Sequence, residues 1–86
     1  MKKDYLKVKV FWLPTTKEVF FEGEAESVSS QNQLGKFDIL PYHSNFISLI
    51  FKELTIITSK KEKIVYRFEK GVIKVKNNEV VVFLGL

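Results

Sequence analysis

Apolar and polar residues alternate one by one along most of this sequence. Within residues 5–12, Leu6, Val8 and Val10 are separated by Lys7 and Lys9, which gives an extended segment one apolar and one charged face. Similar short runs occupy residues 19–22, 24–28, 47–50, 54–58, 64–69 and 73–76. No stretch of comparable length places its apolar residues at helical spacing. The pattern therefore predicts an all-β chain.

Turn-forming residues separate these runs. Residues 59–62 and the pair Asn77 and Asn78 each lie between runs rich in β-branched residues, and Asn tolerates the positive φ angles of tight hairpins. We therefore expect a hairpin at each place. Further breaks are marked by Gly23, Gly35 and Pro41. About eight to ten short strands in so short a chain indicate an antiparallel β-sandwich or barrel.

The length and composition predict one domain over residues 1–86. Hydrophobic residues make up 45% of the chain, so a packed core is expected rather than intrinsic disorder. The longest apolar runs, 46–51 and 80–84, are far shorter than a membrane-spanning helix. Lys7 and Lys9 interrupt the segment in which the apolar region of a signal peptide would lie, so we expect no signal peptide.

Residues typical of catalysis and metal binding are few. The chain has no cysteine, and His43 is its only histidine, which leaves no partner for a metal site or for a nucleophile and its base. The four glycines are too far apart to form a phosphate-binding loop. Glu22, Glu24 and Glu26 alternate on a predicted strand and are interpreted as a solvated face. We therefore expect no catalytic residue, no cofactor and no metal.

The net charge of +4 leaves a nucleic-acid partner open. Arg67 is the only arginine among fourteen basic residues, whereas specific nucleic-acid contacts rely on the arginine fork. A lysine-rich solvated surface is the simpler explanation of this charge. The alternative is a small basic β-barrel that binds single-stranded nucleic acid on stacked aromatic side chains, and an exposed aromatic pair would favour it.

One uncharged polar segment interrupts the alternation. Residues 29–35 read SSQNQLG and are followed by KFDILPYH. We interpret the segment as a loop that leads into a proline-fixed turn. Loops on a rigid scaffold often carry binding residues, so this is the first candidate for a functional site, although an exposed turn without a role has the same composition.

The sequence around this turn resembles a family signature. Residues 35–49, GKFDILPYHSNFISL, are similar to the signature of the epsilon subunit of F-type ATP synthases, called delta in mitochondria. Two flanking blocks agree with the family in order and spacing, namely FEGE at 21–24 with Val28, and GVIKVKNNEV at 71–80. The positions that depart from the family pattern are Asp38, Tyr42, Asn45 and Lys70.

The resemblance implies a β-sandwich of about ten strands and a non-catalytic subunit of the central stalk. Such a subunit couples the gamma subunit to the c ring of a proton- or sodium-translocating ATP synthase, is peripheral at the cytoplasmic face of the inner (plasma) membrane, and binds no nucleic acid. The c-ring-facing loop implied by position in the signature is Ser30, Gln31, Asn32, Gln33 and Leu34. The implied gamma-facing turn is Pro41, Tyr42, His43 and Ser44.

Family members typically continue for about 40 to 50 residues into a C-terminal helical hairpin. This sequence ends at Leu86, so the resemblance implies a form without the hairpin. The hairpin is the part that restrains ATP hydrolysis in the family, and in some members it binds ATP. We therefore expect neither property by that route.

Overall fold

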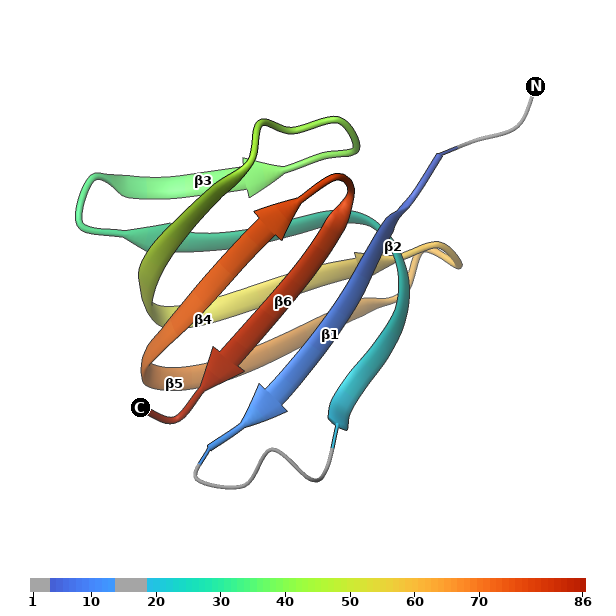
Figure 1. The fold of residues 1–86 in the computed structure, drawn as a ribbon. Coiled ribbons are helices and arrows are strands. Elements are labelled where there is room, and N and C mark those ends of the chain that lie inside the picture. Colours follow the sequence, from blue (N-terminus) through green and yellow to red (C-terminus); the bar gives the residue numbers. More distant parts are fainter. Residues whose placement is uncertain (1–3, 14–18) are drawn as a thin grey trace.

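Six β-strands build the part of the protein that the structure describes. The structure is a computed structural model and describes residues 4–13 and 19–86 (Figure 1). The strands are β1 (Leu6–Trp12), β2 (Val19–Asn32), β3 (Gly35–Ile39), β4 (Phe46–Thr58), β5 (Lys63–Lys76) and β6 (Glu79–Leu84). These residues form no helix, and hence none that is long and apolar enough to cross a membrane. The all-β prediction is confirmed.

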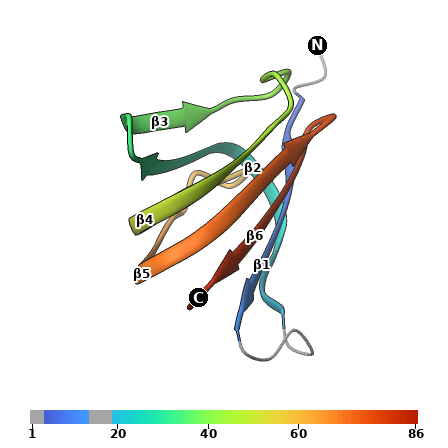
Figure 2. The same cartoon turned by 60° about the vertical axis from the view of Figure 1, so that its left-hand side comes forward.

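The strands close into one barrel-like sheet. Their order is β1-β6-β5-β4-β2-β3, and β1 also pairs with β2, so that five strands form a ring and β3 lies outside it against β2. Figure 2 shows β5, β6 and β1 side by side. Neighbouring strands are antiparallel except β1 and β6, which run parallel. The expected antiparallel arrangement therefore fails at this pair, because β6 is inserted between β5 and the first strand of the chain.

The long strands bend, which gives the ring the two layers of a sandwich. β2 shifts register between Ala25 and Ser27, so that its first half pairs with β1 and its second half with β3 and β4. β4 shifts register against β5 between Phe51 and Lys52. Such bulges redirect a strand without ending its hydrogen bonding. The expected eight to ten strands are therefore wrong, because the separate runs are halves of β2, β4 and β5, and Gly23 lies inside β2.

The core is built from the buried faces of the ring strands together with Ile39 of β3, and it confirms the predicted alternation. In β1, Leu6, Val8 and Val10 are buried while Lys7 and Lys9 are exposed. The buried hydrophobic residues are Leu6, Val8, Val10, Ala25, Val28, Ile39, Ile50, Leu54, Ile56, Ile73, Val75, Val80, Val82 and Leu84. All of them are aliphatic, and aromatic rings pack against this cluster from outside it.

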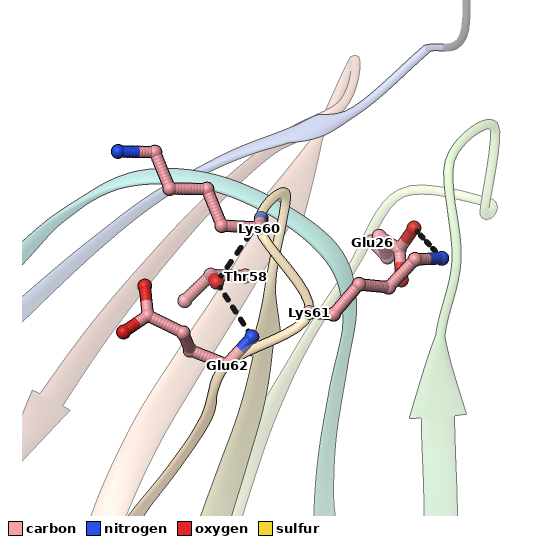
Figure 3. A network of polar contacts seen from close by, with 5 residues as sticks. All are labelled: Glu26, Thr58, Lys60, Lys61 and Glu62. Atoms are coloured by element: carbon pink, nitrogen blue, oxygen red, sulfur yellow. Dashed lines mark hydrogen bonds and ion pairs between the residues drawn. The ribbon is translucent and has the colours of Figure 1, made fainter.

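The hairpin predicted at residues 59–62 is confirmed, and a side chain holds it (Figure 3). The hydroxyl of Thr58, a buried residue, accepts hydrogen bonds from the N–H groups of Lys60 at 3.3 Å and Glu62 at 3.1 Å. These bonds satisfy two backbone donors that the tight turn leaves without a strand partner.

An ion pair joins this turn to β2. The ammonium of Lys61 lies 2.6 Å from the carboxylate of Glu26, which stands at the register shift of β2 (Figure 3). The side chain of Glu26 is only 16% exposed. Glu22 and Glu24 are exposed as predicted, but the interpretation of Glu26 as part of a solvated face is wrong, because the bulge turns this residue toward the β4–β5 turn.

The uncharged segment at residues 29–35 is a hairpin. Residues 29–32 belong to β2, Gly35 begins β3, and only Gln33 and Leu34 form the turn. The backbone pairs in register with β3 from Val28 to Asn32. The prediction of a loop is therefore wrong for most of the segment, because serine and amide side chains occupy both faces of β2 here and hide the alternation.

Candidate functional site

The β2–β3 turn presents an exposed leucine on a fixed backbone. Leu34 is 96% exposed. Its N–H donates to Oδ1 of Asn32 at 2.9 Å, and Gly35 follows with a φ of 124°, which a residue with a Cβ rarely adopts. Nδ2 of Asn32 also donates to Oγ of Ser48 in β4 at 3.3 Å. The turn is thus fastened to β4 while its apolar tip remains in solvent.

Three other residues of the expected c-ring-facing loop, Ser30, Gln31 and Asn32, lie in β2. Gln31 and Asn32 are half-buried in β2, and Gln33 is exposed in the turn. Ser30 is 7% exposed, and its hydroxyl donates to the carbonyl oxygen of Glu53 at 2.7 Å. Ser30 therefore holds β2 to β4, whereas Gln33 and Leu34 form the exposed end of this loop.

Residues 40–43 form the proline-fixed turn that the sequence predicts. The N–H of His43 donates to the carbonyl oxygen of Leu40 at 3.1 Å, with Pro41 and Tyr42 between them. The φ of Tyr42 is 69°, which is the conformation of the third residue of a type II turn. This position favours glycine, because a Cβ is strained at positive φ.

Two hydrogen bonds dock this turn on the β5–β6 hairpin. The N–H of Tyr42 donates to Oδ1 of Asn78 at 2.6 Å, and the N–H of Asn77 donates to Oδ1 of Asn45 at 3.0 Å. Asn77 and Asn78 have φ values of 50° and 64°, which confirms the hairpin predicted there. Tyr42 and Asn45 are two of the departures from the family signature, and both are tied to this hairpin.

The side chains of the turn form a polar and aromatic surface. The Tyr42 phenol donates to the carboxylate of Asp4, and this hydrogen bond raises the pKa of Tyr42. Nδ1 of His43 lies 2.8 Å from the carbonyl oxygen of Ser44, and its ring packs beside Phe46 with centroids 5.2 Å apart. Within residues 4–13 and 19–86, no group of three or more His, Asp or Glu side chains could hold a metal ion. The surface is suited to contact with a protein.

The two expected interfaces lie at opposite ends of β3 (Figure 1). β3 has five residues, which corresponds to about 17 Å of extended chain. Two partners could therefore bind without competing for the same residues, while both remain attached to one hydrogen-bonded sheet.

Sequence reasoning missed an apolar row on the outer face of the ring. From β4 to β2, the neighbours in register are Leu49, Val72, Phe83, Phe11 and Val19. None of them belongs to the buried core, and the rings of Phe11 and Phe83 stack with centroids 5.3 Å apart. The available signal was the unbroken apolar run of β6, which supplies apolar side chains to both faces of a strand. Surfaces of this kind often bind proteins.

Comparisons with known proteins bear on this geometry. Residues 8–84 match the family model described as ATP synthase, Delta/Epsilon chain, beta-sandwich domain. The ATP synthase epsilon chain of Clostridium novyi (strain NT) is 38% identical over 69 residues, covering 79% of this chain and 53% of that protein. A chain in the structure of the Euglena gracilis mitochondrial ATP synthase aligns with a TM-score of 0.80 at 12% identity, covering 93% of this chain and 50% of that one, which shows the likeness of fold. The chain spans about half the length of the relatives it matches.

Proposed function

The chain belongs to the family of ATP synthase delta/epsilon chain β-sandwich domains, and from this membership we propose that it is a non-catalytic subunit of the central stalk. In this role it couples the gamma subunit to the c ring of a proton- or sodium-translocating F-type ATP synthase. It is then peripheral to the membrane, held at its cytoplasmic face through the complex.

The two turns at the ends of β3 are the surfaces that we assign to the two partners. Gln33 and Leu34 face the c ring, while Ser30, Gln31 and Asn32 fix the turn that presents them. The turn of Pro41, Tyr42, His43 and Ser44 contacts the gamma subunit. Tyr42 is 74% exposed and supplies an aromatic anchor of the kind that dominates protein interfaces.

One observation carries this proposal, namely that each turn is fastened by side-chain hydrogen bonds to a different part of a closed sheet. Asn32 ties the β2–β3 turn to β4, and Asn78 ties the Tyr42 turn to the β5–β6 hairpin. A close-packed closed sheet deforms little under load. A force applied at one turn is therefore delivered at the other, which is the mechanical task of a coupling subunit.

The test is binding of the chain to the gamma subunit and to the c ring of the same ATP synthase. We expect a stable complex with the gamma subunit that is weakened by Tyr42→Ala, and binding to the c ring that is weakened when Gln33 and Leu34 are replaced by Gly and Ser. Each change should leave binding to the other partner unaltered. Failure of the unaltered chain to bind either partner would contradict the proposal.

The same preparation tests the nucleic-acid alternative. Phe20 is 50% exposed and stacks on Trp12 with centroids 5.8 Å apart. Each ring occupies one face of the other, and Trp12 is half-buried, so this pair offers less free ring surface than the platforms on which successive bases stack. We therefore expect only weak binding of a single-stranded oligonucleotide, whereas tight binding that falls steeply with salt would favour the alternative.

A further inference from the structure

β3 has one edge without a strand partner in the part of the chain that the structure describes. It stands at the end of the strand order and pairs only with β2, whereas each of the other five strands has at least two neighbours. Figure 2 shows β3 at the margin of the molecule, outside the ring. A free edge presents backbone N–H and C=O groups that can pair with a strand of another chain.

The register of β3 against β2 determines which backbone groups are free. The two-residue turn makes Asn32 and Gly35 a hydrogen-bonded pair, and in an antiparallel sheet such pairs alternate with pairs that are not hydrogen-bonded. Phe37, two residues after Gly35, therefore directs its N–H and C=O toward β2. The N–H and C=O groups of Lys36 and Asp38 point to the free edge.

The side chains of Lys36 and Asp38 lie on the solvent face of β3. Both residues are exposed, while Phe37 between them is half-buried and packs against Phe46 with ring centroids 5.7 Å apart. The hydroxyl of Ser29, the register partner of Asp38, donates to its carboxylate at 2.6 Å, which holds this negative charge on the strand. Lys36 forms no ion pair with a described residue. The free edge thus carries one positive and one negative charge, two residues apart.

We propose that β3 pairs antiparallel with β3 of a second copy of this chain, in a register centred on Phe37. This register places Lys36 of each copy opposite Asp38 of the other. The backbone groups of the free edge then form two hydrogen-bonded pairs, and the side chains form two cross-strand ion pairs. The contact is two-fold, because both copies use the same residues. Charges of one sign, by which proteins often protect a free edge, would instead repel the second copy.

The length of β3 limits the strength of this contact. β3 has only five residues, so the pairing is much smaller than the interface of a permanent dimer and is reversible. The dimer therefore forms at high protein concentration and dissociates on dilution. The proposal concerns the free chain and does not rest on the proposed function.

The experiment is sedimentation equilibrium of the full chain between about 10 µM and about 1 mM, at about 50 mM salt. The unaltered chain should form dimers as the concentration rises. Asp38→Lys and Lys36→Asp each place two pairs of like charges opposite one another, so each should weaken dimerisation about tenfold or more. The net charge rises in one variant and falls in the other, so overall repulsion cannot explain both losses. An equal mixture of the two variants should dimerise again, because each lysine then faces an aspartate of the other chain.

A matched control is Lys74→Asp, which changes the net charge as Lys36→Asp does. Lys74 is exposed in β5, which is paired on one side with β4 and on the other with β6. This variant should dimerise like the unaltered chain, and circular dichroism should show that every variant remains folded. An unaltered chain that stays monomeric throughout the range, or a mixture of the two β3 variants that stays monomeric, would overturn the proposal. Undiminished dimerisation of Asp38→Lys would show that the copies meet at another surface, such as the outer apolar row, and would overturn it as well.

Discussion

The N–H of Tyr42 donates a hydrogen bond to Oδ1 of Asn78 at 2.6 Å, across 36 positions of sequence. This bond, with its counterpart from Asn77 to Asn45, makes the proline turn and the β5–β6 hairpin one structural unit. The surface that we assign to the gamma subunit is therefore shaped by residues outside the signature itself. Substitutions in the β5–β6 hairpin should therefore alter the conformation of the proline turn.

Asn78→Gly tests this link. Glycine keeps the φ of 64° accessible but removes the acceptor, so the free energy of unfolding should fall by about 1 kcal/mol, as for loss of one hydrogen bond. Urea denaturation measures it. Asn77→Gly is the matched control, because Asn77 has a φ of 50° and contributes its backbone N–H, which glycine retains. Equal losses in the two variants would show that the side chain of Asn78 does not hold the turn.

Tyr42 occupies a backbone conformation that suits glycine better. A non-glycine residue at a φ of 69° is strained by about 1 kcal/mol. Tyr42→Gly and Tyr42→Ala remove the same phenol and its hydrogen bond to Asp4, but only glycine relieves the strain. Tyr42→Gly should therefore be more stable than Tyr42→Ala by about 1 kcal/mol in urea denaturation. A more stable alanine variant would mean that the turn relaxes to another conformation.

The half-buried Tyr66 predicts a loss of stability at high pH. Burial raises the pKa of Tyr66 above its ordinary value of 10.0, and its hydroxyl donates to the carbonyl oxygen of Phe20 at 3.3 Å. The folded state thus favours the neutral phenol, so the contribution to stability is complete below the unfolded pKa and is lost as pH rises through the folded pKa. Unfolding followed from about pH 9 to about pH 11 should lose stability less steeply in Tyr66→Phe. Identical slopes in the two proteins would contradict this.

Thr58 tests how the β4–β5 turn is held. Its hydroxyl accepts from the N–H groups of Lys60 and Glu62, and the residue is buried. Thr58→Val keeps the shape but leaves both donors without this acceptor, so the free energy of unfolding should fall by about 1–3 kcal/mol. Thr58→Ser keeps the hydroxyl and should lose less, although it removes a methyl group. Thermal unfolding of the two variants distinguishes them, and a more stable Thr58→Val would show that water satisfies the turn.

How far the sequence predicted this structure depends on whether the responsible contacts are local. The alternation of β1 and the Asn77-Asn78 hairpin were predictable, because strand periodicity and turn preference act within a few residues. The bulges of β2 and β4 were not, because a bulge keeps the local pattern of a strand and depends on the neighbouring strand. Because of these bulges, the sequence pattern predicts more strands than the six that the structure contains.

In the candidate site, too, the features set by local contacts could be predicted and those set by distant segments could not. The proline turn was recognisable from its own residues, and the resemblance drew attention to it. The docking of Tyr42 on Asn78 could not be predicted, because it joins segments that only the closed sheet brings together. The exposed apolar residues beside the β2–β3 turn, Leu34, Ile47 and Leu49, were missed for a related reason. They belong to different segments of the sequence, and their proximity depends on how the β2–β3 turn lies against β4.

Gly71 offers the most stringent test of the closed sheet, because it stands where β5 lies between β4 and β6. A Cβ at this position would lie 2.6 Å from the carbonyl oxygen of Phe83 and 3.0 Å from the side chain of Leu84. Backbone cannot yield there without disturbing the pairing of β5 with β6, so Gly71→Ala should lower the free energy of unfolding by about 2–4 kcal/mol.

Gly23→Ala is the control for this prediction, because its Cβ would meet only the end of the Phe21 ring, at 3.3 Å. A side chain can move where a strand cannot, so this change should cost less than about 1 kcal/mol. Urea denaturation of both variants measures the difference. Equal losses of stability in the two variants would show that the close approach of β5 to β6 does not limit the side chain at Gly71. They would contradict the tight packing of these two strands in the ring.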